Sequence, residues 1–205
     1  MQYAMPGSDD ALYTFKNRYE NYIGGEWLAP LEGKYFENIS PVTGESFCEM
    51  PRSTPADLNK ALDAAHAAAD AWGKTAAAER SNVLLKIADR IEANLETLAY
   101  VETWENGKAI RETLNADIPL LADHFRYFAG CIRAQEGSAS EIDANTVSYH
   151  FPRAPGCRGP DYPVELSLAH GRLETRPGIG SRQLCGVETG RADTHLYPGV
   201  DGDDR

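Results

Sequence analysis

NYIGGEW, at residues 21–27, is a short β-type run that a pair of glycines interrupts. A second pair of β-type runs follows it, YFENI at residues 35–39 and SFCEM at residues 46–50. Between these runs lies PVTG, residues 41–44, whose proline and glycine are typical of a turn. The sequence therefore predicts strand, turn and strand ahead of the helices.

Three amphipathic helices are predicted after these strands. The first begins at TPAD, residues 54–57, where a hydroxyl can cap backbone amides and proline takes the first helical position, and it ends at Gly73. The third contains Pro119, which must kink or split it. Apolar residues recur at helical spacing in all three: Leu58, Leu62, Ala65, Ala69 and Trp72; Leu84, Ile87, Ile91, Leu95 and Leu98; and Leu114, Ile118, Leu121, Phe125, Phe128 and Ile132.

Residues 139–151 are predicted to form an extended strand, because Val147 and Tyr149 alternate with Ser148 and His150. Residues 1–14 are expected to be a flexible N-terminus. The composition changes abruptly after Phe151. Residues 152–205 contain no Lys, Phe, Trp, Met or Asn, and 15 of these 54 residues are Pro or Gly. We therefore expect a disordered tail.

The formal net charge of -11 argues against nucleic acid and anionic membranes as partners. We expect a cytoplasmic protein, because the chain has no apolar run long enough to span a bilayer and its start has no signal-peptide pattern. The cysteines form no C-x-x-C pair, and Cys48 and Cys131 are expected to be reduced and half-buried. No histidine pair has metal-ligand spacing, so we predict no metal site.

Four motifs follow one another along the chain: YIGGEW at residues 22–27, NISPVTGE at 38–45, WENGK at 104–108 and HFRYFAG at 124–130. In this order and spacing they resemble the aldehyde dehydrogenase superfamily. The stretches at residues 116–119 and 131–137 are most similar to bacterial acetaldehyde dehydrogenases. The resemblance covers about residues 15–151.

This resemblance implies an α/β fold, of which residues 15–151 would form the N-terminal part, with β-hairpin strands, three amphipathic helices and one oligomerisation strand. It also implies a homo-oligomer that oxidises a small aldehyde to the carboxylic acid with NAD or NADP. In the family, a cysteine thiolate attacks the aldehyde, hydride passes to the nicotinamide, and a glutamate-activated water hydrolyses the thioester. All these groups lie downstream of the matched region. We therefore predict no catalytic, cofactor-binding or metal-binding residue in this chain, and we expect it to bind no cofactor.

The tail offers no replacement for these groups. Gly178-Ile179-Gly180 is followed by Gln183, where a dinucleotide fingerprint needs its third glycine. Cys157 and Cys185 have no nearby histidine or helix start to activate a thiol. The acidic end, residues 201–204, lacks the later glutamate of a calcium loop.

The tail nevertheless agrees with the family in a shifted reading frame. After the strand, the family continues with P-W-N-F-P and then G-N-x-V-V-L-K-P. The second codon bases of Pro-Val-Glu-Leu-Ser, residues 163–167, can be C, T, A, T and C, which begin the codons for P-W-N-F-P. The same rule holds for RQLCGVET, residues 182–189, against the second family motif. We hypothesise that residues 152–205 are the family's cofactor-binding segment translated one frame off.

Two functions remain open from the sequence. The first is an aldehyde dehydrogenase whose damaged copy is inactive alone, and the second is a non-catalytic helical fragment that associates with another subunit, which could be a full-length relative. We expect the helices to keep apolar side chains such as Leu84, Ile91, Phe125 and Phe128 exposed, because the sheet that they should cover is missing. The fragment should then be aggregation-prone or only marginally stable. The sequence does not decide which aldehyde is the substrate, NAD against NADP, or the origin of the shifted tail.

Overall fold

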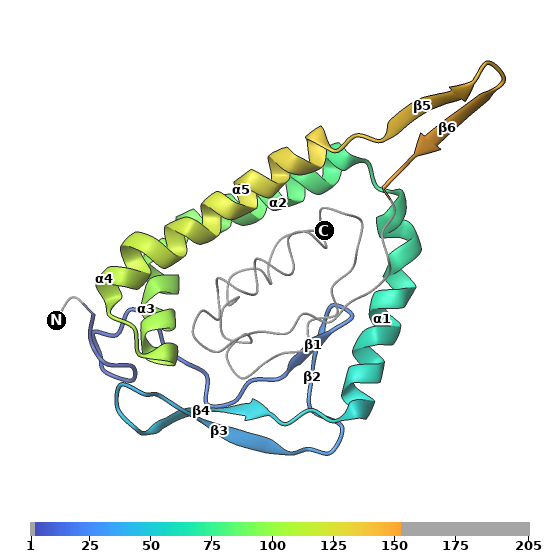
Figure 1. Cartoon of the computed structure of the whole chain (residues 1–205). Helices are drawn as coiled ribbons and strands as arrows, with labels where there is room; N and C mark the ends of the chain where they lie inside the picture. Colours follow the sequence, from blue (N-terminus) through green and yellow to red (C-terminus); the bar gives the residue numbers. More distant parts are fainter. Residues whose placement is uncertain (1–2, 153–205) are drawn as a thin grey trace.

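A computed structural model describes residues 3–152 of the chain, and the predictions for the tail from residue 153 onward lie outside this range. The elements, in chain order, are β1 Asn21–Ile23, β2 Glu26–Leu28, β3 Tyr35–Ile39, β4 Ser46–Pro51, α1 Pro55–Lys74, α2 Ala77–Ala93, α3 Leu95–Asn106, α4 Ile110–Glu112, the π-helical turn η1 Thr113–Asp117, α5 Ile118–Ala134, β5 Ser138–Asp143 and β6 Thr146–His150. Helices α2 and α5 lie side by side, and α1 leads away from them toward β1–β2 and β3–β4 (Figure 1).

Both predicted hairpins are present near the N-terminus. Strands β1 and β2 pair antiparallel, and the turn between them places Gly24 and Gly25 at φ 64° and 90°, which favours glycine. Strands β3 and β4 also pair antiparallel around the predicted turn, with a register shift at Asn38 and Ile39. A small cluster of buried side chains lies at this hairpin and contains Tyr19, Cys48 and Met50.

Helix α1 begins where the sequence predicts. The backbone N–H and the hydroxyl of Thr54 both donate to Asp57 Oδ2 at 2.8 Å, and the other carboxylate oxygen accepts from the Leu31 N–H at 2.8 Å. Burial alone would raise the pKa of Asp57, but these hydrogen bonds outweigh it and hold the pKa below 3.8. The helix runs one residue past the predicted end at Gly73.

The second predicted helix is divided into α2 and α3 at Asn94. This residue has φ −114° and ψ 19°, outside the helical region, and its side-chain amide donates to the Arg90 carbonyl at 2.9 Å. Asparagine competes with the helix in this way because its short amide reaches the backbone. The third predicted helix is not broken, because Asp117 and Ile118 keep helical dihedral angles where the π-helical turn η1 passes into α5. Pro119 lies in the first turn of α5, directly after this irregular turn.

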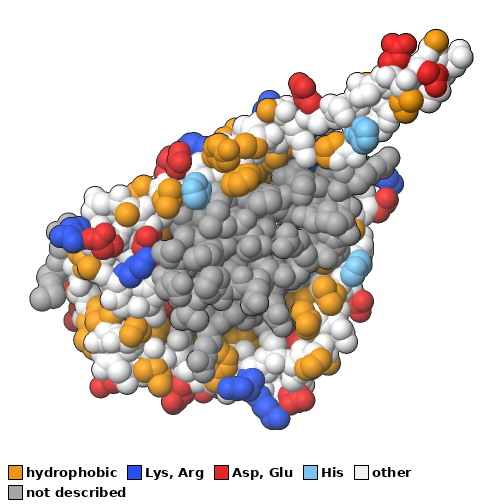
Figure 2. Space-filling view, viewed as in Figure 1, with side chains coloured by type: hydrophobic (Ala, Val, Ile, Leu, Met, Phe, Trp, Pro, Cys, Tyr) orange, Lys and Arg blue, Asp and Glu red, His pale blue; other side chains and the backbone are white. Residues whose placement is uncertain are grey.

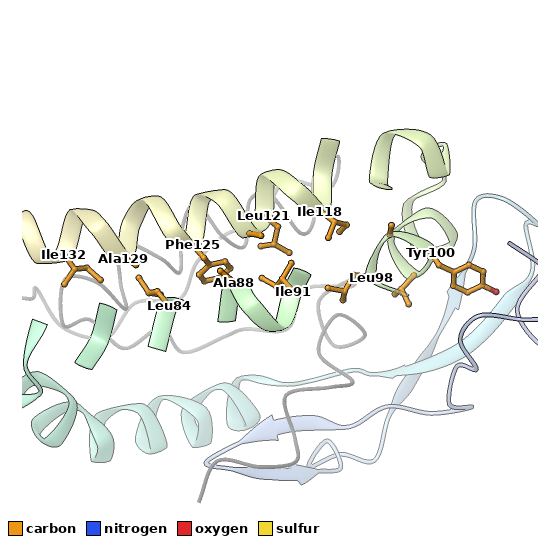
Figure 3. Close-up of a cluster of buried hydrophobic side chains, with 13 residues drawn as sticks. Leu84, Ala88, Ile91, Leu98, Tyr100, Ile118, Leu121, Phe125, Ala129 and Ile132 are labelled. Carbon is orange, nitrogen blue, oxygen red and sulfur yellow. The ribbon is translucent and has the colours of Figure 1, made fainter. Parts of the chain in front are cut away.

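The prediction that the helical stripes are exposed is wrong. Leu84 is 0% exposed, Ile91 5% and Phe125 2%, and Phe128 is partly buried against the same cluster. Figure 3 shows why, because the labelled side chains of α2 and α5 point toward one another. Each of these helices therefore covers the apolar stripe of the other, and α3 extends the cluster through Leu98 and Tyr100.

The segment before β1, for which the sequence predicts flexibility up to residue 14, contacts this helical core. The hydroxyl of the fully buried Tyr100 donates to the Ala4 carbonyl at 2.7 Å. Tyr3 and Tyr13 pack against the core cluster, and the Tyr3 hydroxyl donates to Glu96 at 3.1 Å. These contacts place the segment on the core, and its flexibility stays a prediction.

Candidate interaction surface

The hairpin of β5 and β6 projects from the end of α5, away from the rest of the described chain (Figure 1). The sequence predicts one extended strand here, and the structure instead has two antiparallel strands joined at Ala144 and Asn145. The Asn145 N–H donates to Asp143 Oδ1 at 2.9 Å. Asp and Asn at these positions are the turn signal that the sequence interpretation missed.

The two faces of this hairpin differ in polarity. Tyr149 pairs with Ala139 and Val147 with Glu141, so these four residues share one face. The opposite face carries the pair Ser140 and Ser148. One face of β6 is therefore apolar, and it continues to Phe151, whose ring stacks on Tyr149 with centroids 6.2 Å apart.

We call Val147, Tyr149 and Phe151 the aromatic face of the hairpin. Their exposed fractions are 52%, 64% and 67%, and Ile142 in β5 is 67% exposed as well. Figure 2 shows the hairpin as an arm on which hydrophobic and acidic side chains face solvent. Within the described residues each strand of the hairpin has a single neighbour, so each leaves one edge unpaired. Exposed apolar groups next to unpaired strand edges are typical of an association surface.

Two of the sequence motifs meet in space and hold β3–β4 against the end of α3. The Ser40 hydroxyl donates to the Trp104 carbonyl at 2.6 Å, and the Asn38 side-chain amide donates to Glu105 Oε1 at 2.8 Å. Gly107 ends α3 at φ 82°, and a Cβ there would lie 3.0 Å from Pro41 Cγ. These motif residues therefore join the hairpin to the helical core.

The thiols of Cys48 and Cys131 have different surroundings. Cys48 is 4% exposed, and its pKa is raised to about 12 by burial first and by the charge of Glu105 second, against a smaller lowering by an Asn38 hydrogen bond. Such a thiol is protonated at neutral pH and is a poor nucleophile. Both thiols are free as predicted, but the prediction that they are half-buried is wrong, because Cys48 is buried and Cys131 is exposed on α5. Cys157 and Cys185 lie outside the described residues.

The described part of the chain does not fit a nicotinamide cofactor. Dinucleotides bind at the carboxyl ends of parallel strands, whereas residues 3–152 contain three two-stranded antiparallel sheets. Within the same residues, no group of three or more His, Cys, Asp or Glu side chains could hold a metal ion. None of the helices described is long and apolar enough to cross a bilayer.

Comparisons with known proteins agree on one family. The family model described as "Aldehyde dehydrogenase family" matches residues 27–159. The chain is 61% identical over 181 residues to an acetaldehyde dehydrogenase of Pseudomonas aeruginosa and 62% identical over 180 residues to an EPTC-inducible aldehyde dehydrogenase of Rhodococcus erythropolis. A solved NAD-dependent aldehyde dehydrogenase of Sinorhizobium meliloti is similar in structure, with a TM-score of 0.80 and 30% identity.

These alignments also define how much of each protein is shared. They cover 88% of this chain but 36% of either curated relative, and for the solved structure 89% of this chain and 37% of that protein. The chain therefore spans about a third of the length of the proteins that it matches. Because the aligned 181 residues exceed the 151 residues that end at Phe151, the similarity extends beyond the stretch 15–151.

Proposed function

This chain belongs to the aldehyde dehydrogenase family, and from that premise we propose that it comes from a cytoplasmic oxidoreductase that converts a small aldehyde to its carboxylic acid with NAD or NADP. The described residues are an α/β portion of that fold, at its N-terminal end. The names of the relatives support aldehyde oxidation. The resemblance of residues 116–119 and 131–137 to acetaldehyde dehydrogenases supports a short substrate.

We propose further that the described part of the chain serves assembly and not catalysis. The single observation that carries this proposal is the aromatic face, whose three apolar side chains are more than half exposed on a projecting hairpin. The occupant that we assign to it is a second subunit of the same family. Apolar side chains cannot carry out hydride transfer, whereas burying them against another chain is favourable by about 25 cal/mol per Å² of apolar surface.

The catalytic part of the proposal is tested with the purified 205-residue chain. We expect no NAD or NADP affinity by calorimetry, because the described sheets are two-stranded and antiparallel. We also expect no NADH absorbance with acetaldehyde, because the Cys48 thiol is held protonated. A full-length relative, such as the Pseudomonas aeruginosa enzyme, is the positive control. Oxidation of acetaldehyde by the 205-residue chain alone would contradict the proposal.

The assembly part is tested by sedimentation velocity over a range of concentrations. We expect the chain to self-associate or to join a full-length subunit when the two are mixed. Val147→Asp places a charge on the aromatic face and should shift the distribution toward monomer. Ser140→Asp, on the opposite face of the same hairpin, is the matched control and should leave the distribution unchanged. A chain that stays monomeric at every concentration and in every mixture would overturn the assembly proposal.

A third proposal concerns the tail, which we infer to be the family's cofactor-binding segment in a shifted frame. The codon agreement at residues 163–167 and 182–189 supports it, because an unrelated tail would agree at only a minority of positions. The alignments that continue past Phe151 count against a break at that residue. The coding nucleotide sequence decides the matter. A shifted reading should restore P-W-N-F-P, and its absence from all frames would refute the inference.

A further inference from the structure

The segment that joins α5 to the β5–β6 hairpin contains a glycine whose Cβ position lies closer to other atoms than that of any other described glycine. Gly137 lies between the end of α5 at Ala134 and the start of β5 at Ser138. A Cβ atom placed on Gly137 would lie 2.3 Å from the carbonyl oxygen of His150 and 3.3 Å from Cδ1 of Phe151. The chain segments that enter and leave the hairpin therefore close against each other at this glycine.

The reason for glycine here is space and not backbone conformation. Gly137 is not among the described glycines with positive φ, so its backbone is accessible to any residue. The obstacle to a side chain is a backbone oxygen, which cannot rotate away as the end of a flexible side chain can. Glycine in or beside a strand often marks such a close backbone approach.

We propose that Gly137 is a positioning residue that sets the direction in which the β5–β6 hairpin leaves α5, and that association with a second subunit depends on it. This inference rests on the proposed assembly function of the aromatic face. A methyl group at residue 137 must displace the His150 backbone or the hairpin entry, and the Phe151 ring lies in its path as well. Because Phe151 stacks on Tyr149, the displacement reaches the aromatic face directly.

In this proposal the second subunit covers the aromatic face and also pairs with an unpaired strand edge of the hairpin, so the direction of the hairpin matters. Apolar contact tolerates small shifts, whereas strand pairing at about 4.8 Å spacing requires the two backbones to run in register. A rotated hairpin could still bury Tyr149, but it would not present its edge at the same angle. We therefore expect association with the second subunit to weaken strongly when the segment between α5 and β5 is displaced.

The test compares Gly137→Ala with Gly130→Ala, which adds the same methyl group to α5, where a Cβ would meet nothing within 4 Å. Sedimentation equilibrium measures the association constant, while circular dichroism and thermal melting report the helical core. We expect Gly137→Ala to weaken association at least tenfold with unchanged helicity and melting temperature. Gly130→Ala should associate as the unmodified chain does.

Each other outcome has a defined meaning. Equal association constants for Gly137→Ala and the unmodified chain would overturn the role of Gly137 while leaving the assembly function intact. A loss of helicity in Gly137→Ala would also overturn it, since the residue would then act on the fold and not on the hairpin. An unmodified chain that does not associate at all would instead refute the assembly function on which the inference rests.

Discussion

The α2–α5 helix pair buries its apolar side chains, whereas the β5–β6 hairpin, which directly follows α5, exposes them. In the helix pair, Leu84 is 0% exposed and Phe125 2%. In the hairpin, Tyr149 and Phe151 are 64% and 67% exposed. The helical stripes are therefore buried against each other, whereas the hairpin keeps apolar side chains exposed, as the proposed association requires. Stability should therefore reside in the first region and association in the second.

The largest effect is expected from Phe125→Ala in the helix pair. Removing a buried aromatic ring leaves a cavity, and such changes lower the free energy of unfolding by about 3–5 kcal/mol. Tyr127→Ala is the control, because Tyr127 is 64% exposed on the same helix, and it should change stability by less than about 0.5 kcal/mol. Urea unfolding followed by circular dichroism measures both. Equal losses of stability in the two variants would contradict the assignment of stability to the buried stripes of α2 and α5.

The double substitution Tyr149→Ser and Phe151→Ser tests the hairpin from the other side. We expect association to weaken at least tenfold, equivalent to about 1.4 kcal/mol, since exposed aromatic anchors dominate interface energies. The urea midpoint of the helical core should stay the same, because neither ring contributes to the buried cluster. A fall in the urea midpoint would show that the hairpin stabilises the helical core, which would contradict the assignment of stability to the helix pair.

The junction between α3 and β3–β4 should respond by a smaller amount. Gly107→Ala forces a left-handed backbone onto a residue with a Cβ, which also meets Pro41 at 3.0 Å, so we expect a loss of about 1–2 kcal/mol. Gly73→Ala, inside α1 with nothing within 4 Å, should instead stabilise the chain by about 0.5–1 kcal/mol. Thermal melts of the two variants should therefore move in opposite directions.

The smallest effect concerns the two thiols and their dependence on pH. Burial raises the pKa of Cys48 from 9.0 to about 12, so its protonated form stabilises the fold fully below pH 9, and this contribution is lost as the pH rises toward 12. Cys48→Ala should flatten the loss of stability in that range. At pH 8, a thiol reagent should label the exposed Cys131 and leave Cys48 unlabelled until urea unfolds the chain. Equal labelling of both in the folded chain would contradict this assignment.

Local signals in the sequence predicted most element positions well. The glycine pair at residues 24 and 25 and the capping residues Thr54 and Asp57 act on neighbouring backbone groups, so their effect is visible without the fold. Pro119, which was expected to kink or split the third helix, lies in the first turn of α5, directly after the irregular turn η1. Asn94 and the turn at Asn145 were equally local signals, but each lay inside a periodic pattern that outweighed it.

The candidate surface was less accessible to sequence interpretation. Alternation along residues 146–150 identified a strand, but it could not show that Val147 and Tyr149 face solvent. The role of Gly137 could not be inferred at all, because the atoms that exclude a side chain belong to His150 and Phe151 across the hairpin.

The amino-acid order thus settles what depends on residues within a few positions of one another: caps, tight turns, helical periodicity and the family motifs. It does not settle which apolar stripe covers which, because Leu84 and Phe125 are far apart in the chain and meet only when α2 and α5 pack. Only the tertiary structure shows that α2 and α5 bury their apolar stripes against each other, whereas the apolar side chains of the β5–β6 hairpin stay exposed. The physical reason is that burial depends on the whole set of neighbours in space, whereas periodicity records only the direction in which a side chain leaves its own backbone.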